Sequence, residues 1–153
     1  MKLQKYLTVD NIFICDACRD TGSFYHEFAH FLKEKNVIKD AKTVKRLFIK
    51  RESLHSTAIG KGAAAPHIFS PEFSSFLIFI GLIKKGIDFK SRDGMNVHLV
   101  FLIMSDDRDV GLHLKTLAHI ARMVLNTEVV EEAKKVSDRE ELLALLLDKE
   151  KTL

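Results

Sequence analysis

One histidine stands in a segment of unusually small residues. His67 follows Pro66, and the stretch before it contains Gly60, Gly62 and three alanines. Proline fixes its own φ angle, alanine is too small to cover an imidazole, and glycines let backbone amides come close to a ligand. These features predict an exposed, reactive imidazole. The alternative is a histidine that only completes a hydrogen bond within the loop.

Two residues far from His67 occupy helix positions that are unusual for their chemistry. Arg51 lies seven residues after Val44, so at about 100° per residue it falls on the inward-facing side at the end of a predicted helix. His113 faces inward in the first turns of a later helix, where the macrodipole disfavours an imidazolium. Both positions favour an anionic neighbour. The structural alternatives are a guanidinium that reaches solvent along its own stem and a core imidazole with satisfied hydrogen bonds.

A second group of residues suggests metal or redox chemistry. Cys15 and Cys18 form a lone C-x-x-C, and His26 and His30 follow at a spacing of four, as zinc ligands often do. On a helical wheel, however, both histidines lie opposite the apolar stripe and should face solvent. We therefore expect the cysteines to pack at a strand end in a structural role, with no metal site.

Residues 60–65 match the letters of the dinucleotide-binding fingerprint G-x-G-x-x-A. That fingerprint follows a strand and opens a helix. Here a predicted helix precedes it, and Pro66 forces the residue before it into an extended conformation. The context therefore argues against a nucleotide site.

Composition limits the remaining possibilities. The chain has 153 residues, 24 Lys and Arg against 21 Asp and Glu, and 46% hydrophobic residues, which indicates a single globular domain over residues 1–153. The longest apolar run, 76–83, is far short of the roughly 20 residues that cross a bilayer. Charges of both signs are mixed, which argues against binding to nucleic acid. The N-terminus lacks a secretory pattern, so we expect a cytoplasmic protein.

The hydrophobic periodicity predicts helices on both faces of a mixed sheet. Strands 76–82 and 97–104 are apolar at nearly every position, as expected for strands covered on two sides. Lys84 to Gly86 should end the first of them, and 87–89 could add an edge piece. The segment 55–71 reads as a structured loop with one short strand. The other expected elements are a strand at 11–14 and helices at 23–35, 40–53, 109–125, 128–135 and 138–147. We predict an α/β three-layer sandwich.

The segment from Ser56 to His67 closely resembles the active-site segment of enzyme IIA domains of the fructose, mannitol and nitrogen-regulatory type, from the bacterial phosphoenolpyruvate-dependent sugar phosphotransferase system. The likeness extends to 51–52, 86–89, 97–103, 113–118 and 140–142. Three residues depart from the family pattern: Ala58 stands for glycine, Lys61 for asparagine and Ile68 for a small residue.

The resemblance implies a phosphocarrier. His67 would accept a phosphoryl group from an HPr-like carrier protein and pass it to an enzyme IIB domain, or use it as a signal to regulatory targets. His113 and Arg51 would be active-site residues, and we expect Thr57, Gly60 and Gly62 to bind the phosphate. The alternative is a non-catalytic regulatory protein of the same fold.

The expected chemistry needs no cofactor. A neutral imidazole, with an ordinary pKa of about 6.5, has a free lone pair at pH 7 and attacks phosphorus without a general base. Phosphoryl transfer then depends on positioning and on stabilising the equatorial oxygens. Arg51 could supply a charge-assisted pair of hydrogen bonds to those oxygens.

Overall fold

Two long apolar strands form the centre of the sheet. In a computed structural model that describes residues 1–153, β5 (Leu77–Ile87) pairs antiparallel with β6 (Val97–Ser105). Nearly every residue of β6 is buried, because helices cover both faces of the strand. The sheet has six strands in the order β1-β5-β6-β3-β2, and β4 also pairs with β6. The shorter strands are β1 (Ile12–Ile14), β2 (Ala58–Gly60), β3 (Ala63–Ala64) and β4 (His67–Phe69).

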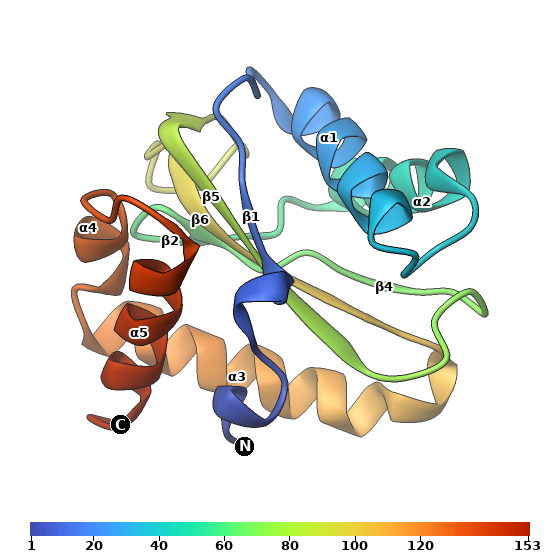
Figure 1. Ribbon diagram of the computed structural model, residues 1–153. Coiled ribbons are helices and arrows are strands. Elements are labelled where there is room, and N and C mark those ends of the chain that lie inside the picture. The colour runs from blue at the N-terminus through green and yellow to red at the C-terminus, as the bar shows by residue number, and fades with distance from the viewer.

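Helices lie on both sides of this sheet (Figure 1). One face carries α1 (Thr21–Glu34) and α2 (Ala41–Leu54), and the other carries α3 (Val110–Asn126), α4 (Val129–Ala133) and α5 (Arg139–Glu150). Each face has its own apolar core, of 22 and 20 buried residues. The structure confirms the predicted α/β three-layer sandwich with a mixed sheet.

Local sequence explains where the first two helices begin. The Asp20 carboxylate accepts a hydrogen bond from the Ser23 amide, and the Asp40 carboxylate accepts hydrogen bonds from the amides of Lys42 and Thr43 at the start of α2. Phe24, Phe28 and Leu32 repeat at helical spacing and are fully buried against the sheet. Three 3₁₀ turns complete the elements: 3–5, 9–11 and 107–109.

Two predicted features of the sheet were wrong. β5 does not end at Lys84 but continues to Ile87, because the exposed Lys84 and Lys85 lie in an irregular stretch of the pairing with β6 that ends at Gly86, where φ is +72°. The segment 55–71 holds three short strands rather than one. β2 and β3 form a hairpin around residues with positive φ, and β3 and β4 both pair with β6.

The cysteines lie away from His67 in the core of the α1 and α2 face. Cys15 and Cys18 form a disulfide, and each is about 5% exposed or less. His26 and His30 are exposed, as the helical wheel predicted. The chain contains no group of three or more His, Cys, Asp or Glu side chains that could hold a metal ion. None of its helices combines the length and the apolar content needed to cross a membrane.

Candidate functional site

His67 begins β4, at the end of the sheet where β6 finishes. Its backbone pairs with Ile103, and its side chain is half-buried. The ring Nδ1 lies 3.3 Å from the Ala65 carbonyl oxygen. A carbonyl only accepts hydrogen bonds, so this contact assigns the ring proton to Nδ1 and leaves the lone pair on Nε2. Burial, together with the positive charge of Arg51, lowers the pKa of His67, which keeps the imidazole neutral at pH 7.

A chain of hydrogen bonds that the sequence analysis missed holds this histidine in place. The Glu52 carboxylate accepts the Tyr25 hydroxyl at 2.5 Å and both the amide and the hydroxyl of Thr57 at 2.7 Å. The Thr57 carbonyl accepts the Ala65 amide at 2.9 Å, and the Ala65 carbonyl contacts His67. Glu52 thus connects α1 and α2 to the backbone next to the imidazole. Its position next to Arg51 was the only feature of the sequence that could have marked Glu52 as part of the site.

Arg51 lies in the last turn of α2, which packs against β4. Val44 and Phe48 on the same side of the helix are fully buried, whereas Arg51 is only half-buried. One guanidinium nitrogen donates to the His55 carbonyl oxygen at 2.8 Å. The partner of this charge is therefore a backbone carbonyl and not the predicted anionic neighbour. The other guanidinium nitrogens make no hydrogen bond within the protein.

His113 faces inward from the first turns of α3, as predicted, and is 2% exposed. Its ring stacks on Phe69 at 4.3 Å between centroids and lies 6.3 Å from the His67 ring. Its Nε2 is 2.6 Å from the Ser105 hydroxyl, whereas its Nδ1 is buried without a partner. Burial, and next the neighbouring His67, lower the pKa of His113 to about 4, so it is neutral at pH 7.

The three expected phosphate-binding residues do not surround His67. Both hydrogen-bond donors of Thr57 are already bonded to Glu52. The carbonyl of Gly62 accepts the His98 amide, whereas His67 pairs with Ile103, so about 16 Å of strand separates them at about 3.3 Å per residue. The turn that contains Gly60 is hydrogen-bonded to Asp93 instead.

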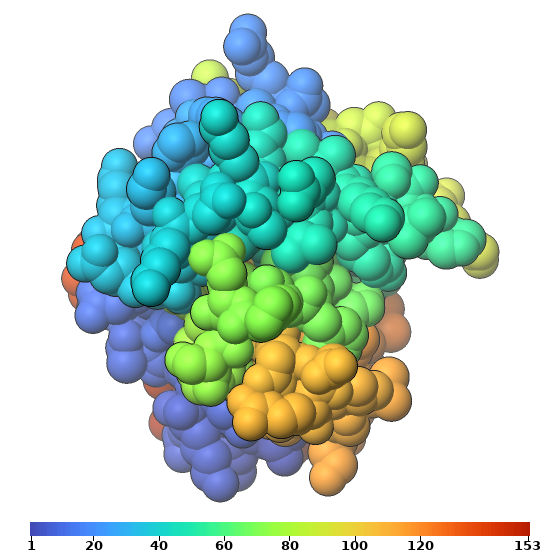
Figure 2. Space-filling model, turned by 90° about the vertical axis from the view of Figure 1, so that its right-hand side faces the viewer, coloured from blue at the N-terminus to red at the C-terminus, as the bar shows by residue number.

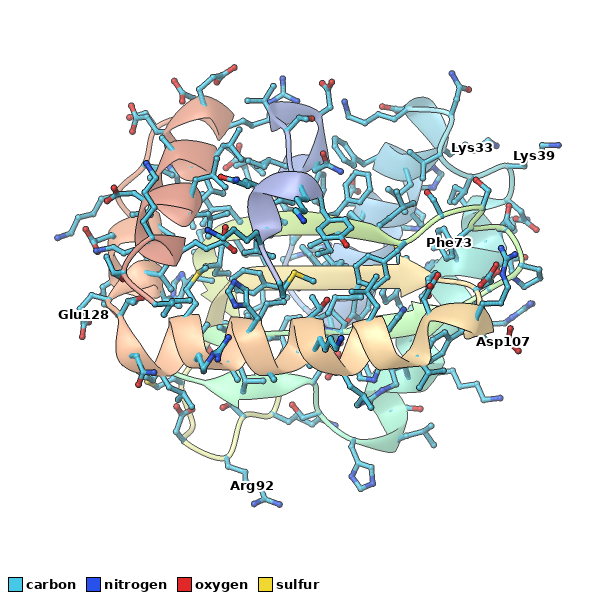
Figure 3. The ribbon with its side chains drawn as sticks, turned by 90° about the horizontal axis from the view of Figure 1, so that it is seen from below. Lys33, Lys39, Phe73, Arg92, Asp107 and Glu128 are labelled. Atoms are coloured by element: carbon cyan, nitrogen blue, oxygen red, sulfur yellow. A yellow bond between two sulfur atoms is a disulfide. The ribbon has the colours of Figure 1, made fainter.

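Figure 3 shows the same separation. Arg92, next to Asp93, lies well apart from Asp107, which stands just before α3 at the His67 end of β6. The structure therefore does not bring Gly60 and Gly62 together with His67. The parallel pairing of β3 with β6 carries this turn to the opposite end of the strand.

The comparison with known families decides where the chain belongs. Residues 5–149 match the model of the family described as "Phosphoenolpyruvate-dependent sugar phosphotransferase system, EIIA 2". The chain belongs to this EIIA family. The match covers nearly the whole sandwich, including Arg51, His67 and His113.

Relatives of known description fall into two groups. The chain is 31% identical over 105 residues to a nitrogen regulatory protein of Bradyrhizobium diazoefficiens, covering 69% of each chain. It is 29% identical over 129 residues to the PTS system fructose-specific EIIABC component of Bacillus subtilis, covering 84% of this chain but only a fifth of that protein's length. The chain is thus similar both to a relative named as a fructose-specific PTS component and to one named as a nitrogen regulatory protein.

Solved structures share the fold. The nitrogen regulatory protein IIA-Ntr of Neisseria meningitidis superimposes with a TM-score of 0.83 at 23% identity, covering 94% of this chain and 98% of that one. Enzyme IIA of the mannitol system of Escherichia coli, in a complex with phosphorylated enzyme IIB, gives a TM-score of 0.75 at 18% identity, covering 93% and 97%.

The side chains around His67 in this EIIA domain suit an anion. Segment 70–76 lies between α2 and the start of α3 on the face shown in Figure 2. Arg51, whose positive charge acts on the His67 ring, brings a permanent cation, and His113, whose ring lies 6.3 Å from that of His67, brings a second imidazole with an unpartnered ring nitrogen. A neutral nucleophile beside a cation can attack an electrophile that carries negative charge.

Proposed function

We propose that this chain is a phosphocarrier that accepts a phosphoryl group on Nε2 of His67. The observation that carries the proposal is the hydrogen bond from Nδ1 to the Ala65 carbonyl, since it leaves Nε2 unprotonated on a neutral ring. Membership of the EIIA family supports phosphotransferase activity in general. The proposed donor is the phosphohistidine of an HPr-like carrier protein.

The transfer balances without a cofactor. The Nε2 lone pair of His67 forms the new bond to phosphorus, the donor's nitrogen–phosphorus bond breaks, and its electron pair stays on the donor imidazole. The Nδ1 proton of His67 remains on its ring, held by Ala65. Arg51 has free guanidinium hydrogens for the equatorial oxygens, where negative charge is spread in the transition state.

We further propose that the phosphoryl group passes from His67 to an enzyme IIB partner or serves as a regulatory signal. The mannitol enzyme IIA that shares this fold is found in a complex with phosphorylated enzyme IIB, which supports the first route. The similarity to a nitrogen regulatory protein supports the second. A pull-down with phosphorylated and unphosphorylated protein separates both routes from the alternative, a non-catalytic regulatory protein of the same fold, whose partners would bind equally in both states.

The labelling experiment tests the nucleophile. Incubation with phosphoenolpyruvate, enzyme I and the carrier should add one acid-labile, alkali-stable phosphate, and His67→Ala should abolish it. His98→Ala is a matched control, because His98 is also half-buried with its Nδ1 bonded to a backbone carbonyl, that of Ile83. Equal labelling of His67→Ala and wild type would refute the assignment.

A further inference from the structure

Ser105 places a buried hydroxyl between the His113 ring and a backbone carbonyl. It is the last residue of β6 and is fully buried. Its Oγ lies 2.7 Å from the backbone carbonyl oxygen of Asp106 and 2.6 Å from Nε2 of His113. Neither contact follows from the sequence pattern, and nothing in the proposed transfer uses Ser105.

Counting hydrogens decides between the two neutral forms of His113. A hydroxyl has one hydrogen, and the Asp106 carbonyl can only accept it. If Ser105 donates to that carbonyl, its oxygen is free to accept a proton from Nε2 of His113, and both contacts are hydrogen bonds. The ring then carries its proton on Nε2, and Nδ1 keeps its lone pair.

The other form leaves more groups unsatisfied. If Ser105 donated to Nε2, the ring proton would sit on Nδ1, which is buried and has no acceptor within reach. The Asp106 carbonyl would also lose its hydroxyl donor. An unmade hydrogen bond at a buried donor is strongly disfavoured, so the surroundings select the form protonated at Nε2.

We propose that Ser105 is a positioning residue that holds the proton of His113 on Nε2 and so reserves Nδ1 as the atom that takes up a proton when His67 is phosphorylated. The second part rests on the proposed function, whereas the first concerns the resting protein alone.

The groups around the His113 ring explain why the proton arrives only with the phosphate. Phe69 and Phe76 cover the ring and carry no charge. His67 faces it from β4, and Asp109, just before α3, is the one carboxylate that favours its charged form. Burial outweighs Asp109 in the resting protein, as the low pKa of His113 shows. Two negative charges on a phosphorylated His67 would reverse that balance, and solvent would supply the proton to Nδ1.

The first test uses unphosphorylated wild-type protein and long-range ¹H–¹⁵N NMR of the histidine rings. We expect His113 to show a protonated Nε2 and an unprotonated Nδ1 near neutral pH. A proton on Nδ1 would overturn the proposal outright. This measurement needs no variant, so it decides the matter even if a substitution at Ser105 fails to fold.

Variants then test the role of the hydroxyl. Ser105→Ala should speed exchange of the His113 Nε2 proton with solvent by about tenfold or more, because its acceptor is lost. Ser105→Thr, which keeps a hydroxyl, should restore slow exchange. Thr116→Val is the matched control, since Thr116 is equally buried on α3 and its hydroxyl bonds to the Leu112 carbonyl instead. Unchanged exchange in Ser105→Ala would contradict the assignment.

Phosphoryl transfer separates this inference from the proposed function. Ser105→Ala should slow transfer about tenfold, the rate equivalent of one neutral hydrogen bond, and shift its pH profile, with Ser105→Thr restoring both. A wild-type protein that takes no label at His67 would refute the proposed function and leave the resting form of His113 standing. A protein labelled at His67 whose His113 carries its proton on Nδ1 would refute only the role of Ser105.

Discussion

Replacing Glu52 with glutamine tests the hydrogen-bond chain that supports His67. The carboxylate accepts three hydrogen bonds, from the Tyr25 hydroxyl and from the amide and hydroxyl of Thr57. A glutamine of the same shape must place its NH₂ group at one of the two oxygen positions. At Oε2 it would face the Thr57 amide, a donor against a donor. At Oε1 it would force both hydroxyls to find new acceptors.

The cost follows from these three contacts. A hydrogen bond to a charged group contributes about 1.5–3 kcal/mol and a neutral one about 0.5–1.5 kcal/mol. Losing one charged bond and converting the other two to neutral ones should therefore lower the free energy of unfolding by about 4–5 kcal/mol. For a domain of this size each kcal/mol shifts Tm by about 2–4 °C, so we expect a fall of about 8–20 °C.

Calorimetry measures the effect, and Glu27→Gln is the control, because the Glu27 side chain is exposed on α1 and makes no hydrogen bond. The same variant should weaken the contact between His67 and Ala65, seen as a change in the His67 ring signals by NMR. A fall in Tm below about 2 °C, equal to that of the control, would refute the view that Glu52 anchors this segment.

Three further outcomes test the site. Arg51→Lys should slow phosphoryl transfer by on the order of 10², about 3 kcal/mol, because lysine cannot donate two parallel hydrogen bonds. The control is Arg46→Lys at an exposed position of the same helix, which should keep the wild-type rate in the same labelling assay. The pKa of His113 is about 4 in the folded protein and about 6.5 when unfolded, so the unfolded state binds more protons between these values. Denaturant titrations should show the free energy of unfolding falling as pH drops from 6.5 toward 4, by up to about 3 kcal/mol, and His113→Gln should flatten that fall. Gly62→Ala, with φ at +85° and a new Cβ 2.9 Å from Val130, should cost about 1–3 kcal/mol of stability. The rate of phosphoryl transfer by the folded variant should be unchanged. A loss of transfer would show that the turn containing Gly62 does take part in phosphate binding.

Sequence patterns predicted the layers of this EIIA domain because the spacing of apolar residues along each element reflects which of its sides are buried. A strand covered on two faces is apolar at every position, as 76–82 and 97–104 are, and a helix covered on one side repeats its apolar residues, as Phe24, Phe28 and Leu32 do. The same rule placed His113 inside, because it shares the buried side of α3. The segment before His67 resembles that of a known family, which predicted the family of the whole chain. The comparison confirmed that prediction.

The arrangement around His67 depended on pairings between distant segments. Gly62 and His67 are five residues apart in a small-residue stretch, which suggested one loop around one ligand. In the structure each pairs with a different part of β6, more than 30 residues away in the sequence, and this register pulls them to opposite ends of the strand. No local pattern contains that register, because it is fixed by how the backbone donors and acceptors of two distant strands pair.

The polar contacts beneath the site were equally invisible in the sequence. Glu52 meets Tyr25 across two helices, and Ser105 meets His113 where β6 turns toward α3. Residue type alone cannot report these contacts, since serine and glutamate are ordinary on a surface and become decisive only when packing removes water from around them. The sequence determined which element carries each reactive side chain, and the tertiary structure decided which of its atoms hold a proton and which are free to react.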